Sequence, residues 1–321
     1  MKKSIGLLLI MVLGIAMVVS AGGRKDDQPL VGYAVMGMID EYWANQVKGM
    51  QAANAANGNK FRLEVADSNY GPQVCLENSL SFLSRGAKVL VVSPPDPQIG
   101  GAIMERANAL KVPVITSDVF LEGTYFLTHD EVRAGEIAGE LAGQYFQENF
   151  RGQQAKVALL SAFQVADQAN MRINGFKSAF SKLVPNPVYL PEFDSEGQRE
   201  KGANLMADII TANPDVNVVF GINDEAGLGA AASIEARGLS DKIVVFGQGG
   251  IGEAAFQALL DPRSPFKGTV AFGPYEHGET MVTELILPLL EGKIPRKVVD
   301  SPLEPATGAN ARKFLDAMKN Q

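Results

Sequence analysis

The sequence predicts an α/β protein made of two similar Rossmann-like lobes, each with a parallel β-sheet. Short apolar, β-branched runs alternate with longer helical patterns through almost the whole chain. Because most of these runs are continuously apolar, they are typical of parallel strands that helices cover on both faces. The same succession of strands and helices occurs twice, at about residues 30–117 and 156–272. The length of the chain also suits two domains better than one.

Each expected strand is a short run rich in valine, isoleucine, leucine or aromatic residues. In chain order these runs are Leu30–Met36, Phe61–Ala66, Lys88–Val92, Val114–Ser117, Tyr125–Leu127, Lys156–Leu160, Val216–Phe220, Ile243–Phe246, Thr269–Ala271 and Lys297–Asp300. The expected helices are longer, with apolar residues at helical spacing. They are Ala44–Asn57, Val74–Arg85, Ile99–Leu110, Val132–Phe150, Met171–Lys182, Lys201–Ala212, Glu225–Arg237 and Glu253–Leu260. No linker rich in proline, glycine or serine separates the halves near Thr128–Asp130, so we expect tight crossings and a cleft that can close on a ligand.

Residues 1–21 have the pattern of a secretory signal peptide. Two lysines precede an apolar run from Ile5 to Val19, and Val19-Ser20-Ala21 fits cleavage before Gly22. The apolar run is short for a membrane span, although an uncleaved signal anchor is an alternative. No cysteine lies near the cleavage site. We therefore expect an exported, periplasmic protein without a lipid anchor.

The chain is acidic, with a formal net charge of −7. An acidic chain without dense clusters of lysine and arginine binds nucleic acids and anionic membranes poorly, so neither is expected as a partner. Cys75 is the only cysteine and is interpreted as a small buried side chain, with a reactive thiol as the alternative. Since the chain has only two histidines, His129 and His277, zinc-type ligation is implausible and no metal is expected.

The segment Asp40-Glu41-Tyr42-Trp43 lies where the first strand gives way to the first helix, and it contains the only tryptophan. In open α/β sheets, ligands bind beyond the carboxyl ends of the strands. Two aromatic rings beside two carboxylates at that place suit a ligand ring whose face stacks while its rim accepts hydrogen bonds. The alternative is that Tyr42 and Trp43 pack the first helix onto the sheet.

The segment Gly247-Gln248-Gly249-Gly250-Ile251-Gly252 matches the glycine pattern of a dinucleotide-binding turn between a strand and a helix. The full pattern also needs an acidic residue at the end of the next strand, and this chain has Phe272-Gly273-Pro274 there. We therefore expect no cofactor. His129-Asp130 could form half of a base–orienter pair, but no nucleophile motif accompanies it. The pair is interpreted as a polar contact at the crossing, and the protein as a non-enzyme.

Polar and aromatic residues follow several of the expected strands. Asp118 follows Val114–Ser117, and Asn223 follows Val216–Phe220. Arg172 begins a helix, and Phe193 follows a short strand. Carboxylates and amides bridge neighbouring hydroxyls, a guanidinium donates two parallel hydrogen bonds, and aromatic faces cover the C–H side of a sugar ring. Their shared position at strand ends therefore indicates a site for a polyhydroxylated ligand.

At these residues the chain resembles the ribose/galactose-type periplasmic sugar-binding proteins that serve ABC transporters. The resemblance spans about residues 30–300 and rests on the order and spacing of several strings. These are Asp40-Glu41-Tyr42-Trp43, Gly86-Ala87-Lys88-Val89-Leu90-Val91-Val92-Ser93-Pro94, Val112-Pro113-Val114-Ile115-Thr116-Ser117-Asp118, Gly135-Glu136-Ile137-Ala138-Gly139, Arg172 with Gly175-Phe176, and Asn213-Pro214-Asp215 leading to Asn223-Asp224.

The resemblance implies the type I periplasmic binding protein fold, in which three crossing strands join two lobes around a sugar. It implies an N-terminal lobe of residues 28–129 and 273–301 and a C-terminal lobe of residues 130–272 and 302–321. Tyr42 and Trp43 would then stack on the sugar from one lobe and Phe193 from the other, while Asp118, Arg172 and Asn223 would hold hydroxyls. The protein would be a monomeric partner of a membrane permease. A sensor that presents its ligand to a membrane receptor or kinase is the alternative.

Three positions depart from the family pattern and lose polar contacts. Val119 stands where ribose-binding relatives have arginine, Gly249 stands where a carboxylate is usual, and Phe272 replaces an amide. Gln248 could partly substitute. We therefore expect a ligand with fewer hydroxyls on that side, such as a polyol, a deoxy sugar or another small sugar-like molecule. The expected ligand-binding residues are Asp40, Tyr42, Trp43, Asp118, Arg172, Phe193, Asn223, Gln248 and Phe272.

Overall fold

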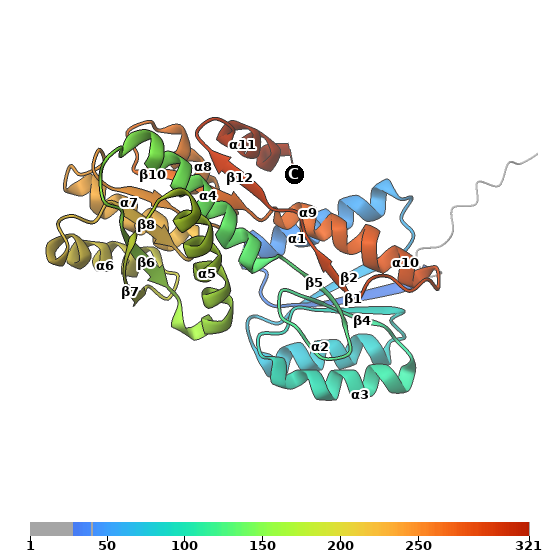
Figure 1. Ribbon diagram of the computed structural model, residues 1–321. Helices are drawn as coiled ribbons and strands as arrows, with labels where there is room; N and C mark the ends of the chain where they lie inside the picture. Colours follow the sequence, from blue (N-terminus) through green and yellow to red (C-terminus); the bar gives the residue numbers. More distant parts are fainter. Residues whose placement is uncertain (1–27, 40, 321) are drawn as a thin grey trace, which may run out of the picture.

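The computed structural model describes residues 28–39 and 41–320 and contains two α/β lobes (Figure 1). The expected signal peptide lies outside the described residues. Each lobe is built on a six-stranded sheet. None of the helices in the described ranges is long and apolar enough to cross a membrane. The predicted α/β fold of two lobes is confirmed.

The first lobe has a fully parallel sheet in the order β11-β5-β4-β3-β1-β2. Its strands are β1 (Leu30–Val35), β2 (Arg62–Asp67), β3 (Val89–Val92), β4 (Val114–Ser117), β5 (Tyr125–Thr128) and β11 (Val298–Asp300). Its helices are α1 (Glu41–Ala56), α2 (Pro72–Ser84), α3 (Gly100–Leu110), α9 (Pro274–Thr280) and α10 (Leu287–Leu290). A 3-10 helix spans Pro97–Ile99 (η2), and a π-helix spans Met281–Ile286 (η4).

Helices cover both faces of this sheet, because β1 alternates between two hydrophobic cores. Val31, Tyr33 and Val35 belong to the core beneath α1 and η4. Leu30 and Ala34 belong to the core beneath α2 and α3. In Figure 1, α2 and α3 lie below the sheet, and α1 and α10 lie above it. Burial on both faces explains why the strand reads as a continuous apolar run.

The second lobe has the sheet order β12-β10-β9-β8-β6-β7, parallel except for the edge strand β12. Its strands are β6 (Lys156–Ser161), β7 (Val188–Asp194), β8 (Val218–Gly221), β9 (Val244–Phe246), β10 (Phe266–Ala271) and β12 (Glu304–Thr307). Its helices are α4 (Glu131–Asn149), α5 (Ala166–Leu183), α6 (Arg199–Ala212), α7 (Asp224–Ala236), α8 (Glu253–Leu260) and α11 (Ala311–Asn320), with a short turn at Phe163–Val165 (η3).

The chain passes between the two sheets three times. The first crossing leads from β5 to α4 and contains His129. The second leads from β10 to α9 through Gly273, whose φ of +56° is left-handed and suits glycine. The third leads from β11 to β12 through Ser301. These short crossings bring residues far apart in the sequence to one place.

Several elements were missing from the sequence prediction. The edge strands β7 and β12 each contain a proline, Pro191 and Pro305. A short strand was expected before Phe193, but its bounds were not, and Phe193 lies within β7. Proline is confined to sheet edges because it cannot donate to the hydrogen-bond ladder. Helices α9, α10 and α11 are short and follow the last regular repeat of the pattern. Their positions depend on packing against the two sheets.

Helices α4 and α5 pack so closely that their glycines have no room for a side chain. A Cβ atom on Gly139 would lie 2.5 Å from the carbonyl oxygen of Phe176, and one on Gly175 would lie 2.2 Å from the carbonyl oxygen of Val132. These contacts are with backbone atoms, which cannot turn away as a flexible side chain can. The glycines therefore set the distance between the two helices.

We expect Gly139→Ala to lower the free energy of unfolding by about 1–3 kcal/mol, because the helices must separate to admit the methyl group. The matched control is Gly101→Ala in α3, where an added Cβ meets no atom within 4 Å. That substitution should raise stability by about 0.5–1 kcal/mol through helix propensity. Urea unfolding followed by circular dichroism measures both values. Equal effects of the two substitutions would contradict the close packing.

Candidate functional site

A cleft of about 790 Å³ lies between the lobes and is lined by residues from both. The first lobe contributes Asp118 and Phe120, which follow β4, and His129, which follows β5. The second lobe contributes Phe163, which follows β6, and Met171 of α5. These residues lie beyond the carboxyl ends of parallel strands, where α/β folds bind their ligands.

Asp118 is held in a fixed orientation at the first-lobe side of this cleft. Its φ of +64° is left-handed, a conformation that aspartate tolerates better than most residues. One carboxylate oxygen, Oδ1, accepts a hydrogen bond of 2.8 Å from the Tyr42 hydroxyl. The other, Oδ2, accepts one of 2.6 Å from the Ser117 hydroxyl. Since 18% of the side chain is exposed, the carboxylate can still accept hydrogen bonds from a ligand.

Ser117 joins Asp118 to a buried chain of hydrogen bonds beneath the cleft. Its Oγ accepts a bond of 3.0 Å from Nε2 of Gln46, whose Oε1 accepts a bond from the Tyr33 hydroxyl. The Tyr33 hydroxyl also lies 2.8 Å from Oγ of Ser93. Strands β1 and β4, helix α1 and Ser93, the residue after β3, are therefore linked through fully buried side chains. Buried polar groups of this kind have to be paired, so the network favours one arrangement.

The same network reaches the crossings through His277 of α9. Nε2 of His277 lies 3.0 Å from Oγ of Ser117, and Nδ1 lies 2.6 Å from Oγ of Ser301. Ser301 belongs to the third crossing, and His277 follows the second. The network thus ties both of these crossings to the floor of the cleft.

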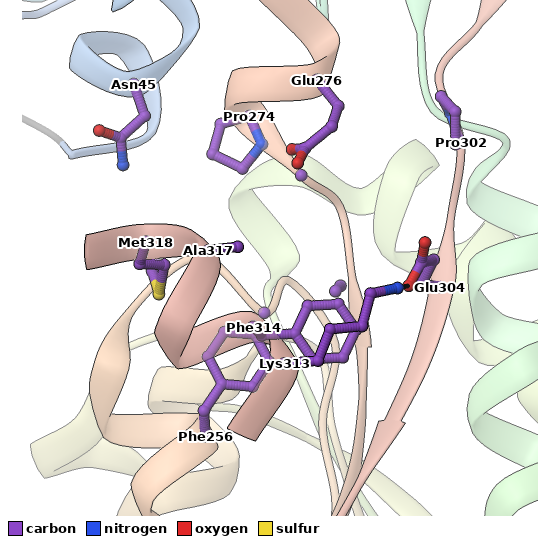
Figure 2. A pocket seen from close by; sticks show the side chains of 13 residues that line it. Asn45, Phe256, Pro274, Glu276, Pro302, Glu304, Lys313, Phe314, Ala317 and Met318 are labelled. Atoms are coloured by element: carbon purple, nitrogen blue, oxygen red, sulfur yellow. Dashed lines mark hydrogen bonds and ion pairs between the residues drawn. The ribbon is translucent and has the colours of Figure 1, made fainter. Parts of the chain in front are cut away.

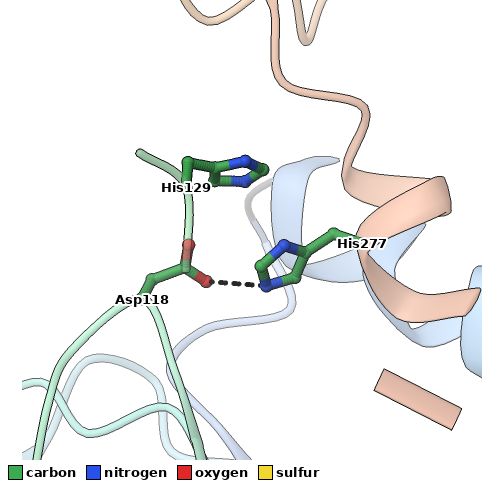
Figure 3. A group of neighbouring side chains, drawn as sticks. All are labelled: Asp118, His129 and His277. Atoms are coloured by element: carbon green, nitrogen blue, oxygen red, sulfur yellow. Dashed lines mark ion pairs between the residues drawn. The ribbon is translucent and has the colours of Figure 1, made fainter. Parts of the chain in front are cut away.

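His129 and His277, the only two histidines of the chain, lie against each other (Figure 3). Their ring centroids are 4.7 Å apart, and both side chains are buried. Burial lowers the pKa of both histidines to about 3. Both are therefore neutral near pH 7, and the 3.6 Å approach of His277 Nε2 to Asp118 Oδ2 is not an ion pair. Asp130 caps α4, because its carboxylate accepts a hydrogen bond from the Arg133 amide. This carboxylate therefore does not orient the His129 ring.

The aromatic residues expected to stack on a ligand are mostly buried. Trp43 is 6% exposed in the first-lobe core and contacts Tyr42 edge-on at 4.9 Å. Phe193 packs against the second-lobe core. Trp43 lies in the first-lobe core, as the alternative of core packing describes. Stacking of Tyr42, Trp43 and Phe193 on a ligand stays a prediction. Asp40 lies outside the described residues.

Two other aromatic residues are exposed at the cleft. Phe120 and Phe163 are 54% and 53% exposed, and they line it from opposite lobes. Sequence reasoning missed both. Phe163 follows β6 just as Asp118 follows β4, so its place after a buried strand was the signal that could have identified it.

Arg172 is paired within the protein by Glu131, a residue that the sequence analysis did not single out. Its Nε and Nη2 donate to the two carboxylate oxygens of Glu131 at 2.5 and 3.1 Å, and its Nη1 donates to the carbonyl of Ile222 at 3.1 Å. The guanidinium also lies over the Phe272 ring, 5.0 Å from its centroid. A ligand would therefore compete with Glu131 for this arginine.

The other expected polar residues also have structural partners. Asn223 caps α7, accepting from the Ala226 amide at 2.9 Å, and donates to the Gly197 carbonyl at 3.0 Å. Gln248 is fully buried and donates to the Ile222 carbonyl at 3.1 Å. Its Oε1 has no hydrogen-bond partner among the described residues. Gln248 and Arg172 thus both donate to the Ile222 carbonyl.

The glycine-rich turn after β9 serves Asp224. The Gly250 amide donates to one oxygen of this carboxylate and the Thr269 hydroxyl to the other, both at 2.5 Å. Gly250 is left-handed and approaches the Ala271 backbone too closely for a side chain. Because the Gly250 amide already binds a carboxylate, it is not free for a pyrophosphate. The turn has a structural role here.

A second hollow of about 110 Å³ lies beside the crossings and is mainly apolar (Figure 2). Phe256, Phe314 and Met318 form its second-lobe wall, and Asn45 and Pro274 lie on the first-lobe side. Asn45, Glu276, Glu304 and Lys313 also line it, but Lys313 and Glu304 pair with each other at 2.6 Å. The larger cleft is therefore the better candidate for a polar ligand.

Residues 11–293 match the family model described as periplasmic binding protein domain. The chain belongs to this family. It is 31% identical to the ribose import binding protein of Escherichia coli K12, over 74% of this chain and 77% of that protein. It is 27% identical to the ribose import binding protein of Bacillus subtilis 168, over 95% and 98%.

Solved structures agree on the fold. A periplasmic solute-binding protein of Actinobacillus succinogenes 130Z, solved with bound D-allose, superposes with a TM-score of 0.75. It is 19% identical, and the match covers 89% of this chain and all of that one. The predicted resemblance is confirmed, and so is the expectation of a binding protein rather than an enzyme.

The protonation of Asp224 can be tested through the pH dependence of stability. Burial raises its pKa to about 6, although the bonds from Thr269 and Gly250 oppose this shift. Between about pH 4 and pH 6 the folded state therefore holds a proton that the unfolded chain has released. The contribution of this group to stability is complete at low pH and is lost as the pH rises through 6.

Asp224→Asn should remove that loss, because an amide stays neutral and can still bond to both Gly250 and Thr269. We expect the variant to be more stable than the parent at pH 7.5, by roughly 1–3 kcal/mol, with the difference shrinking toward pH 4. Urea unfolding at the two pH values measures it. A difference that does not change with pH would show that Asp224 is ionised throughout this range in the folded protein.

Proposed function

We propose that this protein is the substrate-binding component of an ABC-type importer and holds a small sugar or sugar-like molecule between its lobes. The observation that carries the proposal is Asp118, a partly exposed carboxylate held by Tyr42 and Ser117 in a cleft lined by both lobes. Membership in the periplasmic binding protein family and the names of the relatives support it. Export by the predicted signal peptide would deliver the protein to the periplasm.

The positions that depart from the family pattern support a ligand with few hydroxyls. Val119 lines the first-lobe side of the cleft and Phe272 lies in the second-lobe core, and neither side chain forms hydrogen bonds. Arg172 is already paired with Glu131. An unpaired hydroxyl facing these groups would lose roughly 1–3 kcal/mol. A polyol, a deoxy sugar or a similar small molecule avoids that loss.

Closure of the lobes is part of the proposal. Phe120 and Phe163 lie on opposite walls of the cleft and are about half exposed. If the lobes approach each other, these rings can cover a ligand and exclude water from the hydrogen bonds of Asp118. A change of the outer surface on closure would be what the permease recognises. The protein would act as a monomer, with the lobes divided at the three crossings.

Isothermal titration against a panel of monosaccharides, deoxy sugars and polyols tests this proposal. We expect at least one member to bind, and Asp118→Asn to weaken that binding about 10- to 100-fold, because a hydrogen bond to a charged group is lost. Asparagine tolerates the left-handed backbone at this position. The matched control is Asp208→Asn in α6, an exposed carboxylate that does not line the cleft. No heat of binding from any compound with the folded protein would contradict the proposal, and so would equal effects of the two variants.

A further inference from the structure

The cluster of His129, His277 and Asp118 has the chemistry of a metal site. Each of the three side chains offers one ligand atom, and these atoms all lie within 4.8 Å of one another. Figure 3 shows the two rings and the carboxylate converging from three separate segments. On the sequence alone no metal is expected, because the chain has only two histidines and one cysteine. The crossings between the lobes bring them together.

The geometry requires only small movements to hold an ion. Ligand atoms around a tetrahedral zinc ion at 2.0–2.2 Å are about 3.4 Å apart. Nε2 of His277 and Oδ2 of Asp118 are already 3.6 Å apart. His129 lies in the first crossing rather than in a helix or strand, so its ring can move closer more easily than that of His277. The Ser117 hydroxyl, which now bonds to Asp118, would have to turn away.

Two further observations point to a ligand at this place. Nδ1 of His129 is buried and has no hydrogen-bond partner among the described residues, although the side chain is only 3% exposed. A buried polar atom without a partner lowers the stability of the folded state unless a ligand binds it. Nδ1 of His277, in contrast, is held at 2.6 Å by Ser301. Metal-bound histidines use their second ring nitrogen in this way, which fixes the ring and presents the other nitrogen to the ion.

We propose that His129, His277 and Asp118 bind a first-row divalent transition-metal ion of the zinc class. Two imidazoles and one carboxylate suit zinc, nickel or cobalt, whereas calcium and magnesium prefer sites made entirely of oxygen. The Tyr42 hydroxyl lies 2.8 Å from Oδ1 of Asp118 and 3.1 Å from Nε2 of His129, so it borders the site. The bound ion connects the first crossing to the helix after the second crossing. It also engages the carboxylate that faces the cleft.

The small number of histidines makes the test specific. The untagged protein, labelled with ¹⁵N in its histidines, gives ring-nitrogen signals from His129 and His277 alone. After treatment with a chelator, it is titrated with Zn²⁺ while these signals are recorded. We expect signals from both rings to shift with a stoichiometry of one ion per chain. Co²⁺ in place of Zn²⁺ should give the visible absorption of a four-coordinate site.

Two variants and a control separate this site from weak binding elsewhere. His129→Gln and Asp118→Asn should each reduce Zn²⁺ affinity at least about 10-fold, and Asp130→Asn, the neighbouring exposed carboxylate, should change it less than 2-fold. Circular dichroism in the presence of chelator confirms that each variant is folded. Unchanged ring-nitrogen signals at millimolar Zn²⁺ would overturn the proposal. Equal affinity in all three variants would place the ion on other carboxylates and would overturn it as well.

Discussion

The hydroxyl of Ser117 is the point on which the cleft and the crossings both depend. It accepts a hydrogen bond from Gln46, donates one to Asp118 and lies within hydrogen-bond distance of His277. Through these contacts a strand end, the first helix and the helix after the second crossing share one buried polar centre. Buried polar groups are stable only when they are paired, and removing one partner leaves the others unsatisfied. The network therefore opposes independent movement of the crossings and holds the carboxylate of Asp118 toward the cleft.

Much of the fold could be predicted from the sequence, because strands buried on both faces are apolar without interruption. The strand from Val218 to Gly221 and the one from Val89 to Val92 are examples, and every residue in them is buried. Two edge strands, β7 and β12, were absent from the expected strands, whereas the edge strands β2 and β11 were predicted. β12 contains Glu304 and Pro305, and its place in the sheet depends on pairing with β10 rather than on its own composition. The hydrophobic pattern of a strand indicates which of its residues are buried. It does not indicate which distant strand pairs with it.

The candidate site was predicted less completely, because its pairings are long-range. The position of Asp118 after a buried strand was a sufficient signal, and the structure places it in the cleft. The pairing of Arg172 with Glu131 joins two helices, and no spacing in the sequence indicates it. The contact between His129 and His277 depends on the crossings in the same way. Trp43 was ambiguous for another reason, since a ring at the start of a helix can face either the cleft or the sheet.

We conclude that the Ser117 network positions Asp118 for ligand binding, and a pair of serine variants can separate this role from a purely structural one. Ser117→Ala and Ser93→Ala each remove one hydroxyl from a fully buried side chain of the network, but only Ser117 contacts Asp118. Both should lower the free energy of unfolding by about 1–3 kcal/mol. Isothermal titration with a ligand of the parent protein should then show an affinity about 10-fold weaker for Ser117→Ala and nearly unchanged for Ser93→Ala. Equal affinities in the two variants would contradict the account.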